Sequence, residues 1–184
     1  MNWRLKLCLL GILFGFMSCT NKIKKEMELL MSAPINFSDE QLAQYCHGNE
    51  INGNILGHHK YSLVVFVDSV TCSPCFWKQM PQWQSIVDSV NNHNVDISFA
   101  FVFQVKRKNR DRFIESMQQD TLFKYPVYLD TTGVFLKNNP NIPQNKLLHT
   151  FLLDQNNRVI LIGDPVQNRK IRDLFDNILL GNRL

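Results

Sequence analysis

Several patterns that define large classes of enzymes are missing from this 184-residue sequence. It has no Ser/His/Asp set for nucleophilic catalysis, no glycine-rich phosphate loop and no paired acids for general acid–base catalysis. Internal repeats and low-complexity tracts are also missing. The net charge of +4 is too small to indicate a nucleic-acid partner, and a composition of 45% hydrophobic and 20% charged residues is that of an ordinary globular protein. A single domain with a short leader is the simplest organisation.

The apolar run at residues 7–17 is too short to cross a bilayer. As a helix it would rise about 17 Å, whereas the hydrocarbon core is about 30 Å thick. Arg4 and Lys6 precede the run, and this order is typical of a cleaved secretory signal. Residues 16–19 (FMSC) resemble a bacterial lipoprotein box, in which the cysteine is lipidated and becomes the mature N-terminus. An ordinary signal peptide with an incidental cysteine is the alternative.

This leader predicts the organisation and location of the chain. We expect residues 1–18 to be a lipoprotein-type signal peptide and Cys19 to carry the lipid. Residues 19–35 are polar and rich in lysine, and are expected to form a tether over a membrane surface. Residues 36–184 are expected to form the folded domain. The predicted location is the bacterial cell envelope, where the N-terminal lipid holds the protein to a membrane, facing the periplasm or on the outer membrane.

Export leaves few cysteines in the mature domain, namely Cys46, Cys72 and Cys75. In an oxidising compartment a close pair is expected to cycle through a disulfide, and the odd number leaves one thiol over. Cys46 is expected to be a small buried hydrophobic residue. A third redox cysteine or a metal ligand beside His47 is the alternative.

The order of apolar runs and breaks predicts an α/β fold. Strands are expected at residues 61–67, 96–103, 127–129, 147–153 and 159–162, helices at 38–45, 76–90, 111–122 and 168–180, and a turn or loose hairpin at 49–57. The strand–helix–strand half requires a parallel pair, and the last two strands form an antiparallel hairpin. We therefore expect a mixed sheet with central parallel strands and helices on both faces.

The sequence Cys72-Ser73-Pro74-Cys75 lies between a buried strand and a helix. At the start of a helix, unpaired N–H groups and about half a positive charge from the helix dipole favour thiolate over thiol. Cys75 lies one helical turn after Cys72, within bonding distance, and Pro74 costs no hydrogen bond in a first turn. The predicted chemistry is disulfide exchange, in which the Cys72 thiolate attacks and Cys75 resolves the mixed disulfide.

An inert disulfide or half of a zinc site are the alternatives for this pair. Zinc sites usually have four ligands, and the sequence holds no second CxxC or CxxH pair. We therefore expect no metal and no cofactor beyond the dithiol.

The chain resembles the thioredoxin-like superfamily, most closely the membrane-tethered bacterial thiol–disulfide oxidoreductases of the TlpA and ResA type. The resemblance covers about residues 60–180 and is carried by the strand LVVFV, the motif TCSPC, the helix with Met80-Pro81 and the segment HTFLLDQNNRVILIG. It implies a thioredoxin-like domain over residues 36–184, an exposed attacking Cys72 and a resolving Cys75 that pair as a disulfide. It also implies protein thiol or disulfide clients and an upstream redox partner.

The residues around the dithiol depart from that pattern. Thr71 stands where the family usually has Trp, and Pro81 lies six residues after the second cysteine rather than five. Phe66 occupies the place of the buried acid of thioredoxin. Asp68, two residues later on the same strand face, is a substitute proton acceptor for Cys75.

The family's cis-proline position is occupied by Leu148. A cis bond before a non-proline residue costs about 2.5–4 kcal/mol, so we expect a trans peptide and an altered site for partner backbones. His149 follows, and it could lower the Cys72 pKa or complete a Cys72–Cys75–His149 metal site. A strand histidine that points to solvent or caps a neighbour is the commoner outcome.

A dense basic run, residues 106–112, is the remaining feature of note. It is expected to be a solvated loop, with an acidic partner or lipid headgroups as the alternative.

The sequence thus predicts an extracytoplasmic, membrane-anchored thiol–disulfide oxidoreductase. Two other functions stay open. One is a non-catalytic binding or assembly lipoprotein with a structural disulfide, and the other is a copper-delivery protein that uses Cys72, Cys75 and His149.

Overall fold

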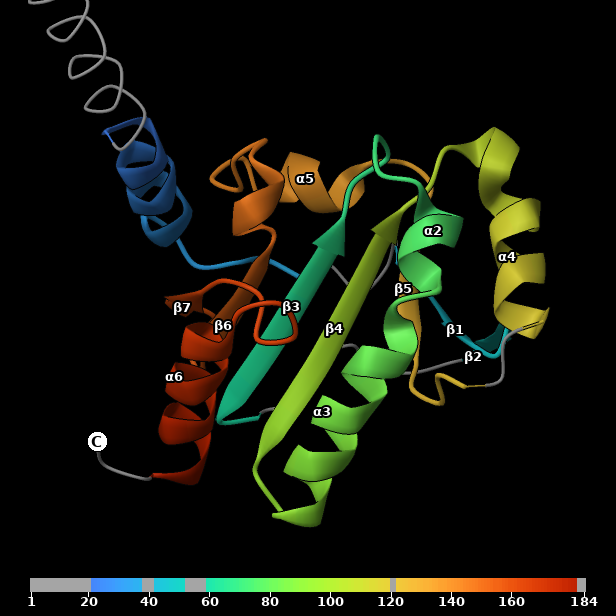
Figure 1. Ribbon diagram of the computed structural model, residues 1–184. Coiled ribbons are helices and arrows are strands. Elements are labelled where there is room, and N and C mark those ends of the chain that lie inside the picture. The colour runs from blue at the N-terminus through green and yellow to red at the C-terminus, as the bar shows by residue number, and fades with distance from the viewer. Residues whose placement is uncertain (1–20, 38–41, 52–58, 120–121, 182–184) are drawn as a thin grey trace, which may run out of the picture.

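A mixed sheet of seven strands forms the centre of the described part of the chain (Figure 1). The structure is a computed structural model that describes residues 21–37, 42–51, 59–119 and 122–181. The predicted signal peptide (1–18), its lipidated Cys19 and the helix cap expected at Ser38 lie outside these ranges.

The sheet has the mixed topology that the sequence predicts. Its strands are β1 (Ala43–Cys46), β2 (Asn49–Ile51), β3 (Tyr61–Val67), β4 (Ile97–Gln104), β5 (Val127–Asp130), β6 (Thr150–Asp154) and β7 (Val159–Ile162), in the order β2-β1-β5-β4-β3-β6-β7. The pairs β3–β4 and β4–β5 are parallel, and the other pairs are antiparallel, including the C-terminal hairpin β6–β7. The predicted fold class is therefore confirmed.

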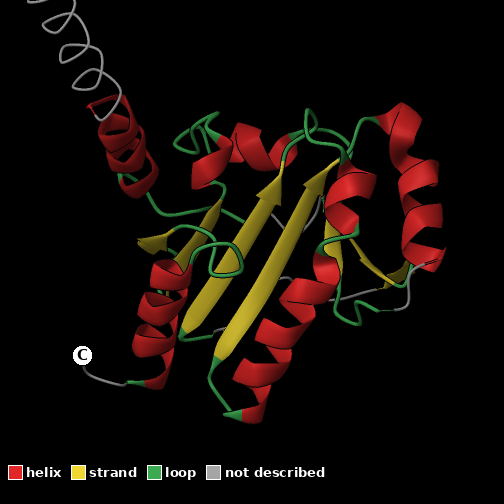
Figure 2. Cartoon of the chain, in the orientation of Figure 1, coloured by secondary structure: helices red, strands yellow, loops and turns green. Residues whose placement is uncertain are grey.

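Helices connect and cover these strands (Figure 2). They are α2 (Ser73–Trp77), α3 (Met80–Asn92), α4 (Arg110–Gln119), α5 (Val134–Asn138) and α6 (Arg169–Leu180), with short 3-10 turns η2 (Arg107–Asn109) and η3 (Lys146–Leu148), and residues 21–31 are also helical. None of the described helices combines the length and the apolar character that a membrane span requires.

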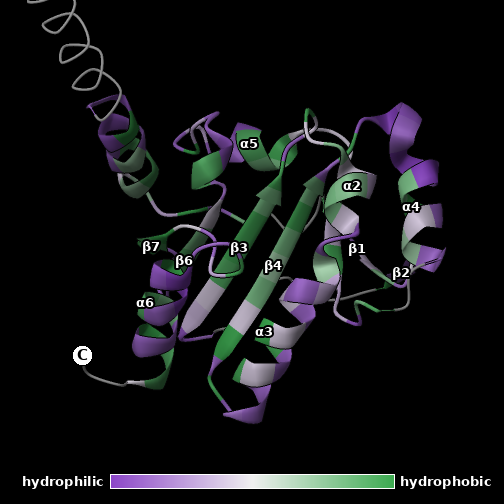
Figure 3. Ribbon diagram, viewed as in Figure 1, coloured by the Kyte–Doolittle hydropathy of each residue, from purple (hydrophilic) through white to green (hydrophobic). Residues whose placement is uncertain are grey.

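Successive side chains of the central strand β3 point to opposite faces of the sheet and therefore belong to two different hydrophobic clusters. Leu63, Val65 and Val67 belong to the cluster that contains the apolar residues of α2, α3, α4 and α6. Val64 and Phe66 belong to the cluster on the other face of the sheet, which also contains buried residues of α5 and is called the α5-side cluster below. Figure 3 shows the hydrophobic colour along β3 and β4 and the hydrophilic colour over much of α4. A strand covered on both faces explains why residues 61–67 are almost uniformly apolar.

The helix predicted at residues 38–45 is wrong where the structure describes it. Residues 43–46 form β1, which pairs with β5 and buries Tyr45. A two-residue turn at His47 and Gly48, both with positive φ, leads into β2. Such turns match the twist of paired strands, and strand pairing determines the conformation of residues 43–46.

The single helix predicted at residues 76–90 is broken at Lys78 and Gln79. The break lies just before Pro81, which has no N–H for the carbonyl of Trp77 and whose ring would clash with that carbonyl. Pro81 instead occupies the first turn of α3, where a missing N–H costs nothing. The dithiol consequently opens a helix of five residues, α2, rather than a long one.

Part of the stretch expected to be a tether packs against the domain. Leu30 and Ile35 are buried in the α5-side cluster. The side-chain amide of Asn141 donates to the carbonyls of Leu30 and Ala33, each at 3.1 Å, and the Ile35 N–H donates to the carbonyl of Asn157 at 2.8 Å. The polar composition of this segment gave no sign of these contacts.

Candidate active site

Cys72 and Cys75 form a disulfide at the carboxyl end of β3, where α2 begins. Their Cα atoms are 5.1 Å apart, and both residues are exposed. Cys72 is the N-cap residue of α2 with an extended backbone, and its carbonyl accepts the N–H of Phe76 at 2.9 Å. Pro74 lies in the first helical turn, as predicted. The structure therefore brings together the two cysteines that the spacing indicates.

The two faces of α2 explain why Cys72 and Cys75 are both exposed residues. Ser73 and Trp77, four residues apart, are the buried residues of this helix. Cys72 and Cys75, three residues apart, lie on the opposite face. A surface Cys75 can be reached by solvent and by large molecules, so access alone does not distinguish the attacking cysteine from the resolving one.

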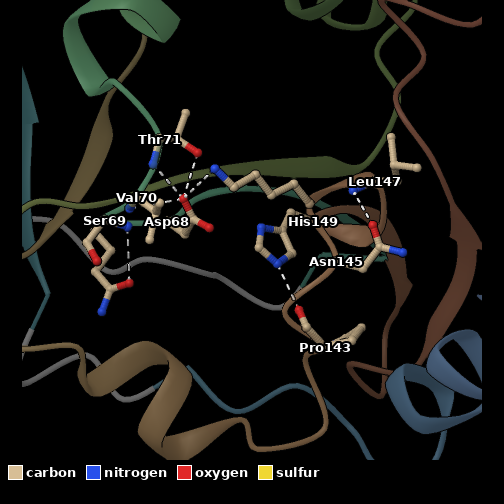
Figure 4. A network of polar contacts seen from close by, with 10 residues as sticks. Asp68, Ser69, Val70, Thr71, Pro143, Asn145, Leu147 and His149 are labelled. Atoms are coloured by element: carbon tan, nitrogen blue, oxygen red, sulfur yellow. Dashed lines mark hydrogen bonds and ion pairs between the residues drawn. The ribbon is translucent and has the colours of Figure 1, made fainter.

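Asp68 holds the turn that leads into the dithiol (Figure 4). Its Oδ1 accepts the N–H of Thr71 at 2.8 Å, the Thr71 hydroxyl at 2.6 Å and the N–H of Val70 at 3.2 Å. Lys146 Nζ, from η3, lies 3.5 Å from the same oxygen. Burial by itself would raise the pKa of Asp68, but the hydrogen bonds from Thr71 and the charge of Lys146 outweigh it and hold this pKa below its ordinary value.

The expected proton exchange between Asp68 and Cys75 stays a prediction. The contacts found for the Asp68 carboxyl within the described residues go to Val70, Thr71 and Lys146. Thr71 is itself the main partner of Asp68. The hydrogen bonds between Asp68 and Thr71 fix the backbone turn that precedes Cys72.

Leu148 and His149 lie in a turn, not in the strand expected at residues 147–153. The Asn145 side chain accepts the N–H of Leu147 at 3.2 Å, and this cap favours η3 over an extended backbone. Strand β6 starts only at Thr150. The described peptide bonds, including the one before Leu148, are trans. The Leu148 side chain is buried in the α5-side cluster, away from the face that α2 covers.

His149 is a buried histidine whose side chain donates a hydrogen bond to a backbone carbonyl. Its Nε2–H donates to the carbonyl of Pro143 at 2.8 Å (Figure 4). Its ring lies 5.0 Å from that of Phe66. Burial lowers the pKa of His149 below 6.5, although the hydrogen bond to Pro143 and the charge of Asp68 oppose the shift. The shift favours the neutral imidazole. The contact with Pro143 is the capping role that was expected of His149, but His149 makes it from a turn and not from a strand.

The described residues contain no group of three or more His, Cys, Asp or Glu side chains placed to hold a metal ion. Cys72, Cys75 and His149 therefore do not form the site that copper delivery requires. Cys46 is partly exposed rather than buried, and its thiol donates to the carbonyl of Lys124 at 3.5 Å.

A cavity of about 400 Å³ lies beside the disulfide. Its lining includes both cysteines, Lys78, Lys106 and Arg112. Lys78 could have been found from the sequence, because it follows Cys75 by one helical turn. The proximity of Lys106 and Arg112 to the cysteines could not have been found from the sequence, because it depends on how the chain after β4 packs against α2.

Two exposed apolar side chains near the dithiol were also missed. Val70, two residues before Cys72, is 80% exposed, and Leu147, in η3, is 75% exposed. Leu147 lines a second cavity together with Thr71 and Phe76. Exposed apolar residues on loops carry no periodic signal, so only the structure reveals them.

No protein-family model matches this sequence, and no curated protein is significantly similar to it. Solved structures do match. A thioredoxin-like protein in its oxidised form is 13% identical with a TM-score of 0.51, over 85% of this chain and 99% of the other. The fold is thioredoxin-like. The mitochondrial 2-Cys peroxiredoxin of Plasmodium falciparum is 16% identical with a TM-score of 0.50, over 82% of this chain and 99% of the other.

StoA from Bacillus subtilis is 23% identical with a TM-score of 0.44, over 66% of this chain and 88% of the other. In the thioredoxin-like fold of the present chain, the disulfide lies at the start of α2, which follows β3. The two structures with TM-scores of 0.51 and 0.50 confirm the predicted resemblance at the level of the fold.

Proposed function

We propose that this protein is a thiol–disulfide oxidoreductase that exchanges the Cys72–Cys75 disulfide with a client protein. The observation that carries the proposal is an exposed disulfide at the start of α2 on a thioredoxin-like fold. A disulfide whose role is only structural does not require exposed cysteines, whereas exchange requires that a partner thiolate reach one of the two sulfurs.

The exchange starts from the disulfide present in the structure. A client thiolate attacks Cys72 Sγ, a mixed disulfide forms, and Cys75 leaves as a thiolate. A second client thiolate then attacks the client sulfur of the mixed disulfide and releases the Cys72 thiolate. The client loses two electrons and gains a disulfide, and the two thiolates of this chain take up protons. The same steps in reverse reduce a client disulfide.

The finer proposal is a membrane-anchored enzyme of the TlpA and ResA type in the bacterial cell envelope. It rests on residues 1–19, with their basic start, short apolar run and lipoprotein-like box. In this account the lipid on Cys19 keeps the domain at a membrane, and an upstream redox partner restores the dithiol or the disulfide after each cycle.

Single cysteine variants test the exchange. In the full-length chain Cys75→Ser should trap a mixed disulfide between Cys72 and a client peptide, because the resolving thiol is missing. Cys72→Ser should trap far less, because Cys75 lies inside the first turn of α2 and does not occupy the N-cap position that Cys72 holds. The two adducts are quantified by mass spectrometry after acid quenching.

The reduction potential of the pair separates an exchanging disulfide from an inert one. A potential above about −300 mV is expected for the catalytic role. A potential below that value, together with equal and low trapping in both variants, would identify a structural disulfide instead. Loss of stability in Cys75→Ser without any exchange would support the same conclusion.

A further inference from the structure

Positive charge gathers on one side of the dithiol. Lys78, Lys106 and Arg112 line the cavity of about 400 Å³ that contains Cys72 and Cys75 in its wall, and no Asp or Glu belongs to its lining. All three basic residues are exposed. A concave site with cations and no carboxylate concentrates anions beside the reactive sulfurs.

The fold brings these three residues together from distant parts of the sequence. Lys78 continues the exposed face of Cys72 and Cys75 beyond α2. Since β3 and β4 are parallel, Lys106 after β4 emerges at the same sheet edge as the dithiol. Arg112 is held nearby because α4 packs on α2, where the rings of Trp77 and Phe113 meet edge to face at 6.0 Å.

These charges are not neutralised within the described residues. None of the ion pairs found there involves Lys78, Lys106 or Arg112. Arg110, from the same basic run, differs, because it pairs with Asp111 at 3.0 Å and donates to the Tyr45 hydroxyl at 2.7 Å. The run therefore contains a structural arginine, Arg110, and two cations that line the dithiol cavity, Lys106 and Arg112. Its other two cations, Arg107 and Lys108, are exposed and do not line the cavity.

We infer that this cavity recognises acidic side chains next to the reactive cysteines of a client protein. The inference rests on the proposed disulfide exchange and names the class of its substrate. A polypeptide fits better than a small thiol, because the exposed apolar residues Val70 and Leu147 extend the contact surface beyond the cavity. One client carboxylate near Lys106 and Arg112 would place a neighbouring client sulfur at Cys72.

The test measures reduction of the oxidised full-length chain by three dithiol peptides. Each carries Cys-Gly-Gly-Cys, flanked by Glu pairs, Lys pairs or Gly pairs, and rates are measured at ionic strengths of roughly 0.01 M and 1 M. The screening length falls from about 30 Å to about 3 Å between these conditions. The acidic peptide should react about tenfold faster than the basic one at low salt, and the difference should disappear at high salt.

Two double variants distinguish the effect of the charges that line the cavity from the effect of the overall net charge. Lys106→Glu with Arg112→Glu alters the cavity, whereas Arg107→Glu with Lys108→Glu alters exposed neighbours that do not line it. The formal net charge falls from +4 to 0 in both. The cavity variant should lose or invert the preference for the acidic peptide, and the control variant should keep most of it.

Each other result has a defined meaning. Equal behaviour of the two double variants would overturn the inference, because general charge would then explain the preference. Equal rates for all three peptides would overturn it and leave the proposed function intact. Faster reaction of dimercaptosuccinate than of the acidic peptide would make a small anionic thiol the occupant. No reaction with the glycine-flanked peptide would overturn the proposed function itself.

Discussion

At the residue scale, the most informative group is the Asp68 carboxyl, which holds the backbone before Cys72. The neighbouring residues Val70 and Thr71 donate to it, and Lys146 pairs with it from another segment. Its position shows how the residues just before Cys72 are held together. The Thr71 hydroxyl supplies the shortest of these hydrogen bonds, at 2.6 Å.

Asp68→Asn should lower the free energy of unfolding at pH 7 by about 1–2 kcal/mol, because the hydrogen bonds to a charged acceptor and the ion pair weaken. The folded-state pKa of Asp68 lies below its ordinary 3.8, so its stabilisation is present above that value and is lost as the pH falls through the folded-state pKa. Urea unfolding at pH 7 and at pH 3 measures the effect. The exposed Asp111→Asn is the control, and an equal small loss in both variants would contradict the role of Asp68.

His149 makes a second pH-dependent contribution, of the kind expected for a buried neutral imidazole. Its folded-state pKa is lowered, so its stabilisation is present above about pH 6.5 and is lost as the pH falls below that value. The loss is up to about 1.4 kcal/mol for each unit of pKa difference. His149→Gln should flatten the fall in unfolding free energy between pH 7.5 and pH 5 relative to the wild type. An unchanged slope in His149→Gln would show that the imidazole is not kept neutral by the fold.

Residues of the site were predictable to different degrees. The spacing of Cys72, Pro74 and Cys75 determined their roles in the first helical turn. The exposure of Cys75 and the burial of Ser73 could not be foreseen, because they depend on how α2 turns against the core. For Leu148 and His149 the expected strand was overridden by a local cap from Asn145.

At the element scale, the packing of α4 on α2 controls the shape of the dithiol cavity. Phe113 is buried, contacts Trp77 and Phe103, and also lines the cavity. The helix α4 was predicted to within a few residues from its apolar period. Its partner could not be predicted, because periodicity identifies a buried face without naming what covers it.

Phe113→Ala should reduce the free energy of unfolding by about 3–5 kcal/mol, because it removes a buried aromatic ring and leaves a cavity. Tryptophan fluorescence during denaturant unfolding reports the change directly through Trp77. The matched control is Ile160→Ala on β7, at a residue that is 40% exposed, with an expected loss below about 1 kcal/mol. Similar losses at the two positions would argue against tight α2–α4 packing.

At the scale of the whole molecule, patterns of two and 3.6 residues were sufficient for the fold class. Buried strands such as β3 and β4 are recognisable because both faces are covered, and the hairpin β6–β7 is recognisable from its short turn. Strand β1 was missed, because a strand of four residues is too short to show a period. The docking of Leu30 and Ile35 was missed because long-range contacts leave no local pattern.

The proposed attachment to a membrane is also a property of the whole chain. Expression of the full sequence in a bacterium with radiolabelled palmitate should label the wild-type protein, because the thiol of Cys19 is the proposed acceptor. Cys19→Ala should remain unlabelled and leave the membrane fraction. The matched variant Cys8→Ala, within the proposed signal, should be labelled like the wild type. Labelling of Cys19→Ala would place the lipid elsewhere.

The central claim is that position at a helix start makes Cys72 the reactive thiol of the pair. The most direct measurement is the pH dependence of iodoacetamide alkylation at each cysteine of the reduced full-length chain, read by mass spectrometry. Because both residues are exposed, the rates report thiolate fraction rather than access. We predict a Cys72 pKa well below the ~8.5 of a free thiol and a rate at pH 6 about tenfold or more above that of Cys75. Equal rates, with both thiols titrating near 8.5, would contradict the account.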